Sequence, residues 1–250
     1  TIAEHIPQDG TIAGPDGPMD AAWHDNFYRQ LNATTLGVRF ESREPFNTHE
    51  VLRLMDGRQD GFASPYNTVH YLNNHDQERT MHLLGTAANT FDDAAFRRAK
   101  LGATLLLTSP GIPMLWMGEE FGQSNDKSLD PRPLHWELLE SERNQGLFQH
   151  YKHLIQLRKS LPALYSDTFE VILDDPGRGL IAFKRWNAEG NVVVVVANLT
   201  HQYAGGFGIG DAGLEDGQWR EVLYNYETTV HGGRLADTLA ESEAKIYVKA

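Results

Sequence analysis

The chain has 250 residues, a formal net charge of −12 and no cysteine. The lack of cysteine excludes disulfides, thiolate nucleophiles and cysteine-based zinc sites. The acidic balance argues against a nucleic-acid partner, because phosphate neutralisation needs clustered Lys and Arg. No apolar run reaches the roughly 20 residues that span a bilayer. We therefore expect a soluble protein, cytoplasmic by default, with a neutral substrate, no membrane segment and no cofactor.

Strand and helix patterns alternate from residue 1 to about 165. Strands are expected at "TIAEHIP" (1–7), "NTVHYLNNHD" (67–76) and "IPMLWMG" (112–118), with a short strand or turn leading into a helix at 18–33. A short helix is expected to begin near Asn47 or Thr48, which are both residue types that cap helices. Longer helices are expected at 90–111, capped by Thr90 or Asp92, and at 144–164.

This alternation, with nearly continuous apolar strands, predicts a parallel sheet covered by helices. Polar side chains follow three of the strands at their carboxyl ends: Glu4-His5, then Asn74-His75-Asp76, then Glu119-Glu120. Ligand sites of parallel sheets and of closed barrels lie at that edge. The sequence therefore predicts a functional site there. The 11 histidines include no HExxH pair, so no metal is expected.

The pattern changes after residue 165. Short β candidates are "FEVILDD", "GLIAFKRWN", "NVVVVVANLT", "QWREVLYNY" and "AKIYVKA", with turn signals that include Gly205-Gly206. We expect two domains, 1–165 with helices and strands and 166–250 as an antiparallel β-sandwich.

Several segments resemble the α-amylase superfamily, the retaining hydrolases and transglycosylases of α-glucans. "YLNNHDQERT" resembles its seventh strand, "TIAEH" the end of its fifth, and "LLLTSPGIPMLWMGEEFGQ" its seventh helix and eighth strand. The resemblance implies the C-terminal half of a (β/α)8 barrel followed by the superfamily's β-domain.

Within the superfamily, "WMGEEFGQ", "PLHWELL" and "MDAAWHDNF" are similar to glycogen (1,4-α-glucan) branching enzymes. A hydrolase of the trehalose-forming, debranching or amylase type is the alternative, because its eighth-strand segment looks much alike. A non-catalytic carbohydrate-binding remnant is a further alternative. The expected partner is an α-1,4-glucan such as glycogen or amylose.

The resemblance assigns roles to individual residues. A retaining enzyme needs a nucleophile and a general acid that later acts as the base, and the acid must keep its proton near neutrality. Glu4 matches the acid/base. Asp76 matches the carboxylate that binds sugar hydroxyls, and His75 a hydroxyl donor beside it. Asn74 and Trp23 are expected to contact substrate.

Other side chains near these motifs are expected to be structural. Trp116 is expected in the core, and Arg79 in an ion pair with Glu78 or another carboxylate at the rim of the site. Of Glu119 and Glu120, one is expected to face the cleft.

The family's nucleophile, an Asp after the fourth strand, has no match here, because only three residues precede Glu4. Asp20 and Asp25 follow the fifth strand and are misplaced for that role. We therefore expect an N-terminal half of the same polypeptide to supply strands one to four. Without it, the open edge strands invite aggregation, and the chain alone is expected to be inactive.

Overall fold

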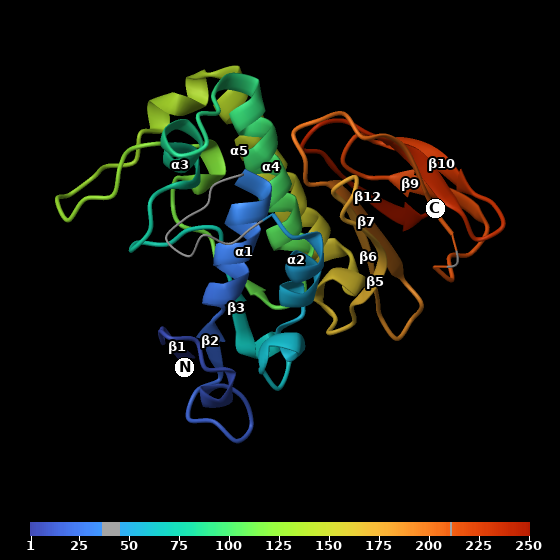
Figure 1. The fold of residues 1–250 in the computed structure, drawn as a ribbon, viewed down its shortest axis with the longest axis horizontal. Helices are drawn as coiled ribbons and strands as arrows, with labels where there is room; N and C mark the ends of the chain where they lie inside the picture. The colour runs from blue at the N-terminus through green and yellow to red at the C-terminus, as the bar shows by residue number, and fades with distance from the viewer. Residues whose placement is uncertain (37–45, 211) are drawn as a thin grey trace.

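A computed structural model describes residues 1–36, 46–210 and 212–250. Figure 1 shows a part built of helices around short strands, coloured blue to yellow, beside a β-rich part coloured orange to red. The long helices α4 (Asp92–Thr108) and α5 (Glu142–Ser160) lie between the two. No helix in these ranges is both long and apolar enough to cross a membrane.

The first part contains one parallel sheet in the order β1-β2-β3-β4. Its strands are β1 (Ile2–Ala3), β2 (Ala21–Trp23), β3 (Thr68–His70) and β4 (Ile112–Pro113). Its other helices are α1 (Asp25–Leu36), α2 (Thr48–Met55) and α3 (Thr80–Thr86). Sequential parallel strands with helices outside are the arrangement expected of part of a (β/α)8 barrel. Within the described residues, β1 and β4 each pair with one neighbour only.

The outer strands are shorter than the sequence predicts. The strands expected at 1–7 and 112–118 are only two residues long in the structure. Each of them lacks a partner strand on one side in the described structure. Beyond β4 the chain makes one further bond, from Met114 N to His70 O at 2.8 Å, and then turns at Gly118, where φ is 91°.

The expected cap of the long helix is wrong. Phe91 occupies the N-cap position of α4 without a side-chain hydrogen bond, and Asp92 is already the first helical residue. Thr90 instead donates its hydroxyl to Ala88 O at 3.0 Å, which takes it out of a capping role.

Helix α2 begins as predicted, with Asn47 as its cap. The Asn47 side chain accepts the Glu50 N–H at 3.0 Å. Asn47→Ala is expected to lower the free energy of unfolding by about 1 kcal/mol, because this N–H loses its partner. Asn47→Asp should retain most of that stability, since Asp also caps helices well. Urea unfolding of the three proteins tests this, and equal stability of the Ala and Asp variants would contradict it.

The second part is an antiparallel six-stranded sheet in the order β10-β9-β12-β7-β6-β5, with a separate pair β11-β8. The strands are β5 (Glu170–Asp175), β6 (Leu180–Trp186), β7 (Val192–Asn198), β8 (Gly205–Ile209), β9 (Gly217–Glu221), β10 (Tyr226–Val230), β11 (Leu235–Leu239) and β12 (Ala244–Lys249). Two predictions fail here. Gly205-Gly206 lies in β8 rather than in a turn, and the strand expected at 218–226 breaks into a hairpin because Asn225 adopts φ of 60°.

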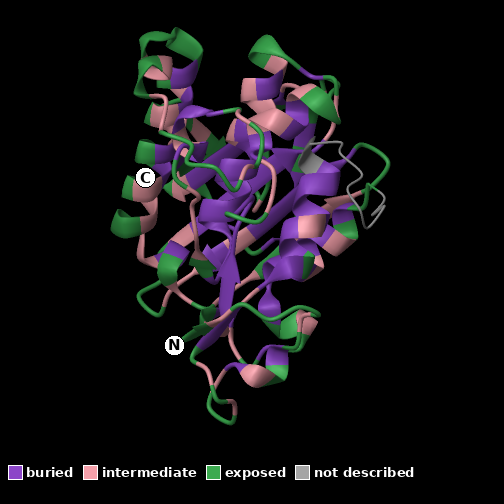
Figure 2. Cartoon of the chain, turned by 90° about the vertical axis from the view of Figure 1, so that its left-hand side faces the viewer, coloured by how far each residue is buried: buried purple, intermediate pink, exposed green. Residues whose placement is uncertain are grey.

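The two parts share one apolar core. A cluster of buried side chains runs from α4 and α5 into β6, β7 and β12, through residues such as Leu105, Leu154 and Phe183. Figure 2, which faces the helical part, shows buried residues in purple at its centre and exposed residues in green around them. A second cluster, which includes Trp219, lies between the six-stranded sheet and the β8-β11 pair.

A buried arginine joins the two parts. Arg185 of β6 is fully buried, and its guanidinium donates to Thr108 O at the end of α4 at 2.8 Å. It also donates to Thr168 O and Ser166 O, each at 2.5 Å. Burial lowers the pKa of Arg185 to about 9, so the group keeps its charge at neutral pH. The Arg185 side chain thus supplies hydrogen bonds to three main-chain carbonyls.

Candidate functional site

The three residues predicted to be catalytic come together at one edge of the parallel sheet. Glu4 directly follows β1, while His75 and Asp76 lie on the loop after β3. One ligand atom from each of the three lies within 4.8 Å of the others. His75 Nε2 is 3.6 Å from Asp76 Oδ2. All three are exposed. The carboxyl ends of parallel strands therefore bring together residues more than 70 positions apart.

Aromatic rings border this cluster. Trp23, at the end of β2, lies with its ring centroid 6.0 Å from that of His75 in an edge contact, and 5.2 Å from that of Tyr71. The Trp116 ring centroid lies 6.1 Å from that of His75. Trp116 is half-buried rather than in the core as expected, because β4 has no described neighbour on its outer side. Flat apolar rings beside polar groups suit the faces of sugar rings.

Asn74 shapes the loop that carries His75 and Asp76. Its side chain is only 4% exposed, and its Oδ1 accepts the Asp76 N–H at 2.8 Å. This is a local turn in which the side chain replaces a main-chain acceptor. A second bond holds the same loop, from the Tyr28 hydroxyl to Gln77 Oε1 at 3.0 Å. Asn74 thus fixes the direction of Asp76, and its contact with substrate remains a prediction.

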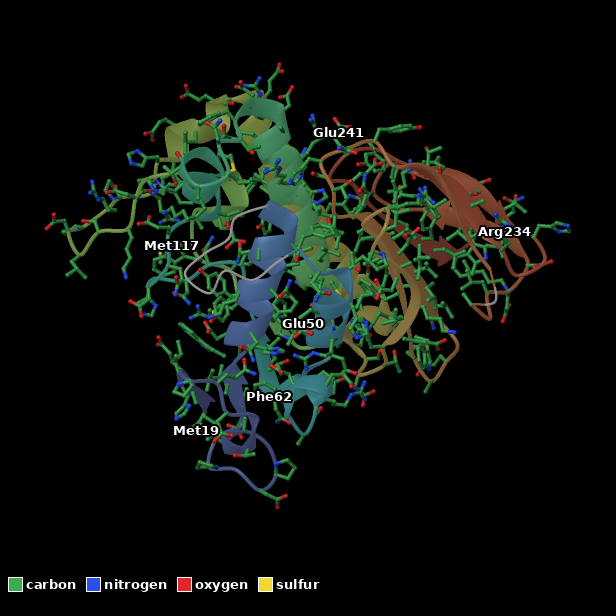
Figure 3. All side chains as sticks on the ribbon, viewed as in Figure 1. Met19, Glu50, Phe62, Met117, Arg234 and Glu241 are labelled. Carbon is green, nitrogen blue, oxygen red and sulfur yellow. The ribbon has the colours of Figure 1, made fainter. Side chains whose placement is uncertain are left out.

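Sequence reasoning missed Lys127. Its Nζ donates to Asp76 O at 2.8 Å and lies 3.9 Å from Asp76 Oδ1, while its N–H donates to Glu78 Oε2 at 2.6 Å. The segment 125–134 thereby encloses a hollow of about 220 Å³ beside His75 and Trp116. Met117, which is labelled in Figure 3, lines this hollow and marks its place in the molecule. A lysine in a loop without periodicity gives no sequence signal, since only the fold brings it to Asp76.

Arg79 does not form the expected pair with Glu78. Its Nη1 donates to Met117 O at 2.7 Å, and its guanidinium lies 5.8 Å from the centroid of the Trp116 ring. Burial lowers the pKa of Arg79. Arg79 therefore fixes the loop after β4 and the position of Trp116.

The two glutamates after β4 lie in the short helix η4 (Glu119–Phe121). Glu120 Oε2 accepts the Gly118 N–H at 2.8 Å. Glu119 is buried and accepts the Tyr151 hydroxyl at 2.5 Å, whereas its Oε2 has no hydrogen-bond partner in the described structure. Burial raises the pKa of Glu119 to about 7. Glu119 thus faces α5 and does not join the strand-end cluster.

Glu119 makes the stability of the fold depend on pH. Because its pKa is higher in the folded than in the unfolded chain, its contribution is largest below the unfolded value and is lost as the pH rises toward 7. Glu119→Gln should therefore change stability little at pH 4.5, and raise it by roughly 2–3 kcal/mol at pH 8. Chemical unfolding across this range tests the prediction. A difference between the two proteins that is independent of pH would contradict it.

The cluster brings together two carboxyl groups and one imidazole, as the sequence predicts. Retention requires a nucleophile and an acid about 5 Å apart, and one oxygen each of Glu4 and Asp76 lie within 4.8 Å of each other. By the resemblance, however, Asp76 binds hydroxyls and is not the nucleophile. No further Asp or Glu joins the group within the described ranges. The same three atoms are close enough to share a metal ion, and the expectation of no metal stays a prediction.

Comparisons with known proteins agree with this architecture. Residues 19–141 match the family model described as the alpha amylase catalytic domain, and residues 171–247 match the alpha amylase C-terminal all-beta domain. The first match lies in the helical part and the second in the β-rich part, in the same order along the chain. The chain belongs to the alpha-amylase superfamily.

Curated relatives at 34–36% identity are named as 1,4-alpha-glucan branching enzymes. The 1,4-alpha-glucan branching enzyme of Burkholderia vietnamiensis (strain G4) is 34% identical over 158 residues, which cover 60% of this chain and 21% of that protein. The branching enzyme of Paraburkholderia xenovorans (strain LB400) is 36% identical over 132 residues, covering 50% and 17%. The chain thus spans about a fifth of the length of these curated relatives.

Solved structures of the superfamily share the fold. An Anoxybacillus alpha-amylase superposes with a TM-score of 0.75 at 24% identity, over 92% of this chain and 47% of that one. AmyP in complex with maltose superposes with a TM-score of 0.81 at 16% identity, over 99% and 54%. These likenesses confirm the predicted α/β fold class, the C-terminal half of a (β/α)8 barrel followed by an all-β domain. The matches to the two alpha amylase family models confirm the sequence-based assignment to the superfamily.

Proposed function

We propose that this chain is the C-terminal part of a 1,4-α-glucan branching enzyme. The observation that carries the proposal is the meeting of Glu4, His75 and Asp76 at the strand ends, in a chain whose curated relatives are branching enzymes. The enzyme would cleave an α-1,4 bond and transfer the released chain to form an α-1,6 branch. The substrate would be glycogen or amylose. The enzyme would act in the cytoplasm.

The geometry supports a double displacement. Glu4 protonates the glycosidic oxygen as the bond to the anomeric carbon breaks, and that carbon bonds to the nucleophile. Glu4, now ionised, then takes the proton from a C6 hydroxyl of the acceptor glucan as its oxygen displaces the nucleophile. Asp76 and His75 hold sugar hydroxyls, through hydrogen bonds that strengthen in the oxocarbenium-like transition state. Trp23 and Asn74 position the ring.

The nucleophile and the rest of the barrel would come from an N-terminal half. The open edges of β1 and β4 support this, as does an apolar hollow of about 400 Å³ beside β4 that includes Leu115, Phe148 and Ile155. A complementary half would pair both strands and fill this hollow. The expected consequence is that the 250 residues alone are inactive on amylose.

Joining the chain to such a half tests the proposal. The gene upstream is expected to encode four strand-helix units in frame, ending in an Asp after a buried strand. A substitute is the N-terminal region of the Burkholderia relative, up to the segment that this chain matches. The joined protein should change the iodine colour of amylose, and the isolated chain should not. Activity of the isolated chain, or none in either joined protein, would refute the proposal.

An α-glucan hydrolase of the amylase, debranching or trehalose-forming type is the second candidate. The fold is shared with a pullulanase from Anoxybacillus sp. LM18-11 solved with maltotriose, at a TM-score of 0.75 and 20% identity. Both reactions pass through the same glycosyl intermediate and differ only in the acceptor, which is water in a hydrolase. A non-catalytic glucan-binding protein would instead bind amylose in the joined form without altering it.

A further inference from the structure

The junction between the helical and β-rich parts contains a second hollow, here called the junction hollow. It lies between α4, α5 and the ends of β9 and β12, is lined by residues such as Lys100, Gln149, His153 and Tyr224, and has a volume of about 320 Å³. Glu241, labelled in Figure 3 between α4 and the β-rich part, marks its position. Small-molecule sites occur preferentially at such domain junctions.

The charges around the junction hollow balance. Arg97 and Lys100 come from α4, while Glu241 and Glu243 come from the β-rich part. Arg97 Nη2 lies 3.0 Å from Glu241 Oε1, so one cation is already paired across the junction. An ionic ligand gains little from a site with two charges of each sign. The site favours a neutral ligand that both donates and accepts hydrogen bonds.

Fixed polar groups meet that requirement. The Thr104 hydroxyl donates to Lys100 O at 2.9 Å, so the nearby His150 Nε2, 2.9 Å from Thr104 Oγ1, acts as the donor of that contact. This leaves His150 Nδ1 as an acceptor. Burial lowers the pKa of His150 to about 4, so the ring is neutral at neutral pH. Gln149 also lines the hollow and adds a side-chain amide, which both donates and accepts.

Tyr224 provides an apolar surface at the same place. Its side chain lines the junction hollow, yet the residue is 57% exposed. An aromatic ring beside hydrogen-bonding groups of both kinds suits a sugar, which has an apolar face and a rim of hydroxyls. The residues that line the junction hollow all belong to this chain, so the 250 residues can be tested directly for binding there.

We propose that the junction hollow binds α-1,4-linked glucose units of a glucan, separately from the strand-end site. The choice of an α-glucan rests on the proposed function, whereas the preference for a neutral sugar rests on the hollow itself. Glucan held there stays attached while the strand-end site acts on another segment of the same polymer.

Titration of the 250-residue chain with maltoheptaose tests this by calorimetry. Tyr224→Ala is expected to weaken binding about tenfold, the usual loss for an aromatic that anchors a ligand. Tyr203→Ala is the matched control, because Tyr203 is an exposed tyrosine of the same β-rich part outside the hollow. Equal affinity of the two variants, or no binding by the parent chain, would overturn the proposal.

A blocking variant guards against misfolding of Tyr224→Ala. Gly146 of α5 lines the hollow, and a Cβ added there meets only Lys100 Nζ at 3.6 Å, an ordinary contact. A Cβ is therefore tolerated at this position, and Gly146→Leu is expected to occupy part of the hollow and weaken maltoheptaose binding at least tenfold. Unchanged affinity in this variant would refute the site. Displacement of maltoheptaose by millimolar inorganic phosphate would show an anion site instead, and would also refute it.

This test separates the site from the proposed function. Maltoheptaose binding that is lost in Gly146→Leu but kept in Trp23→Ala supports the junction hollow, even if the joined enzyme forms no branches. Loss in Trp23→Ala alone would assign the binding to the strand-end site and overturn the inference.

Discussion

Glu4→Gln in the joined enzyme is expected to lower turnover on amylose by about 10²–10⁴-fold, the usual contribution of a general acid-base group. The amide keeps the size of the side chain but supplies no proton to the leaving oxygen. Because Glu4 is exposed at the end of a two-residue strand, the substitution should leave the fold intact. Iodine staining measures the turnover on amylose, and thermal unfolding shows whether the fold is intact.

A substrate that needs no acid sharpens this test. Fluoride leaves without protonation, so the Glu4→Gln variant should still consume an α-maltosyl fluoride in its first step. Glu189→Gln, on an exposed turn of the β-rich part, is the control and should retain full activity. Full activity of Glu4→Gln on amylose would show that another residue is the acid.

Arg185→Met is expected to lower the free energy of unfolding by about 3 kcal/mol or more. The change leaves the carbonyls of Thr108, Ser166 and Thr168 without their donor, and each unsatisfied buried group costs about 1–3 kcal/mol. Because one of these carbonyls ends α4, the loss should loosen the junction of the two parts. Urea unfolding measures the difference.

Arg178→Met is the matched control. Arg178 also binds two main-chain carbonyls, Ala204 O at 2.9 Å and Gly206 O at 2.6 Å, but it is exposed. Water replaces its bonds, so the expected loss is below about 1 kcal/mol. Equal destabilisation by the two substitutions would show that burial of Arg185 is not what matters.

Local patterns predicted the fold class and the meeting of Glu4 with His75 and Asp76. Strand and helix periods repeat along the sequence, and the carboxyl ends of parallel strands share one edge. The same patterns failed where distant contacts decide the outcome. Lys127 reaches Asp76 from a loop about 50 positions away, and Glu119 meets Tyr151, which lies on helix α5.

Strand lengths and caps failed for a related reason. The segment 112–118 is apolar because a barrel interior would bury it, and in this chain only Ile112–Pro113 is paired as a strand. Gly205-Gly206 has the composition of a turn, but pairing with Thr238 and Leu239 holds both residues in β8. Neighbours in space, rather than in sequence, decide these positions.

The most direct test of the central claim compares two products in one reaction of the joined enzyme with amylose. Proton NMR counts the α-1,6 linkages, and a reducing-sugar assay counts the new chain ends. A branching enzyme is expected to form α-1,6 linkages with almost no rise in reducing ends, because each chain that it cuts is transferred. A rise in reducing ends without α-1,6 linkages would contradict the account and identify a hydrolase.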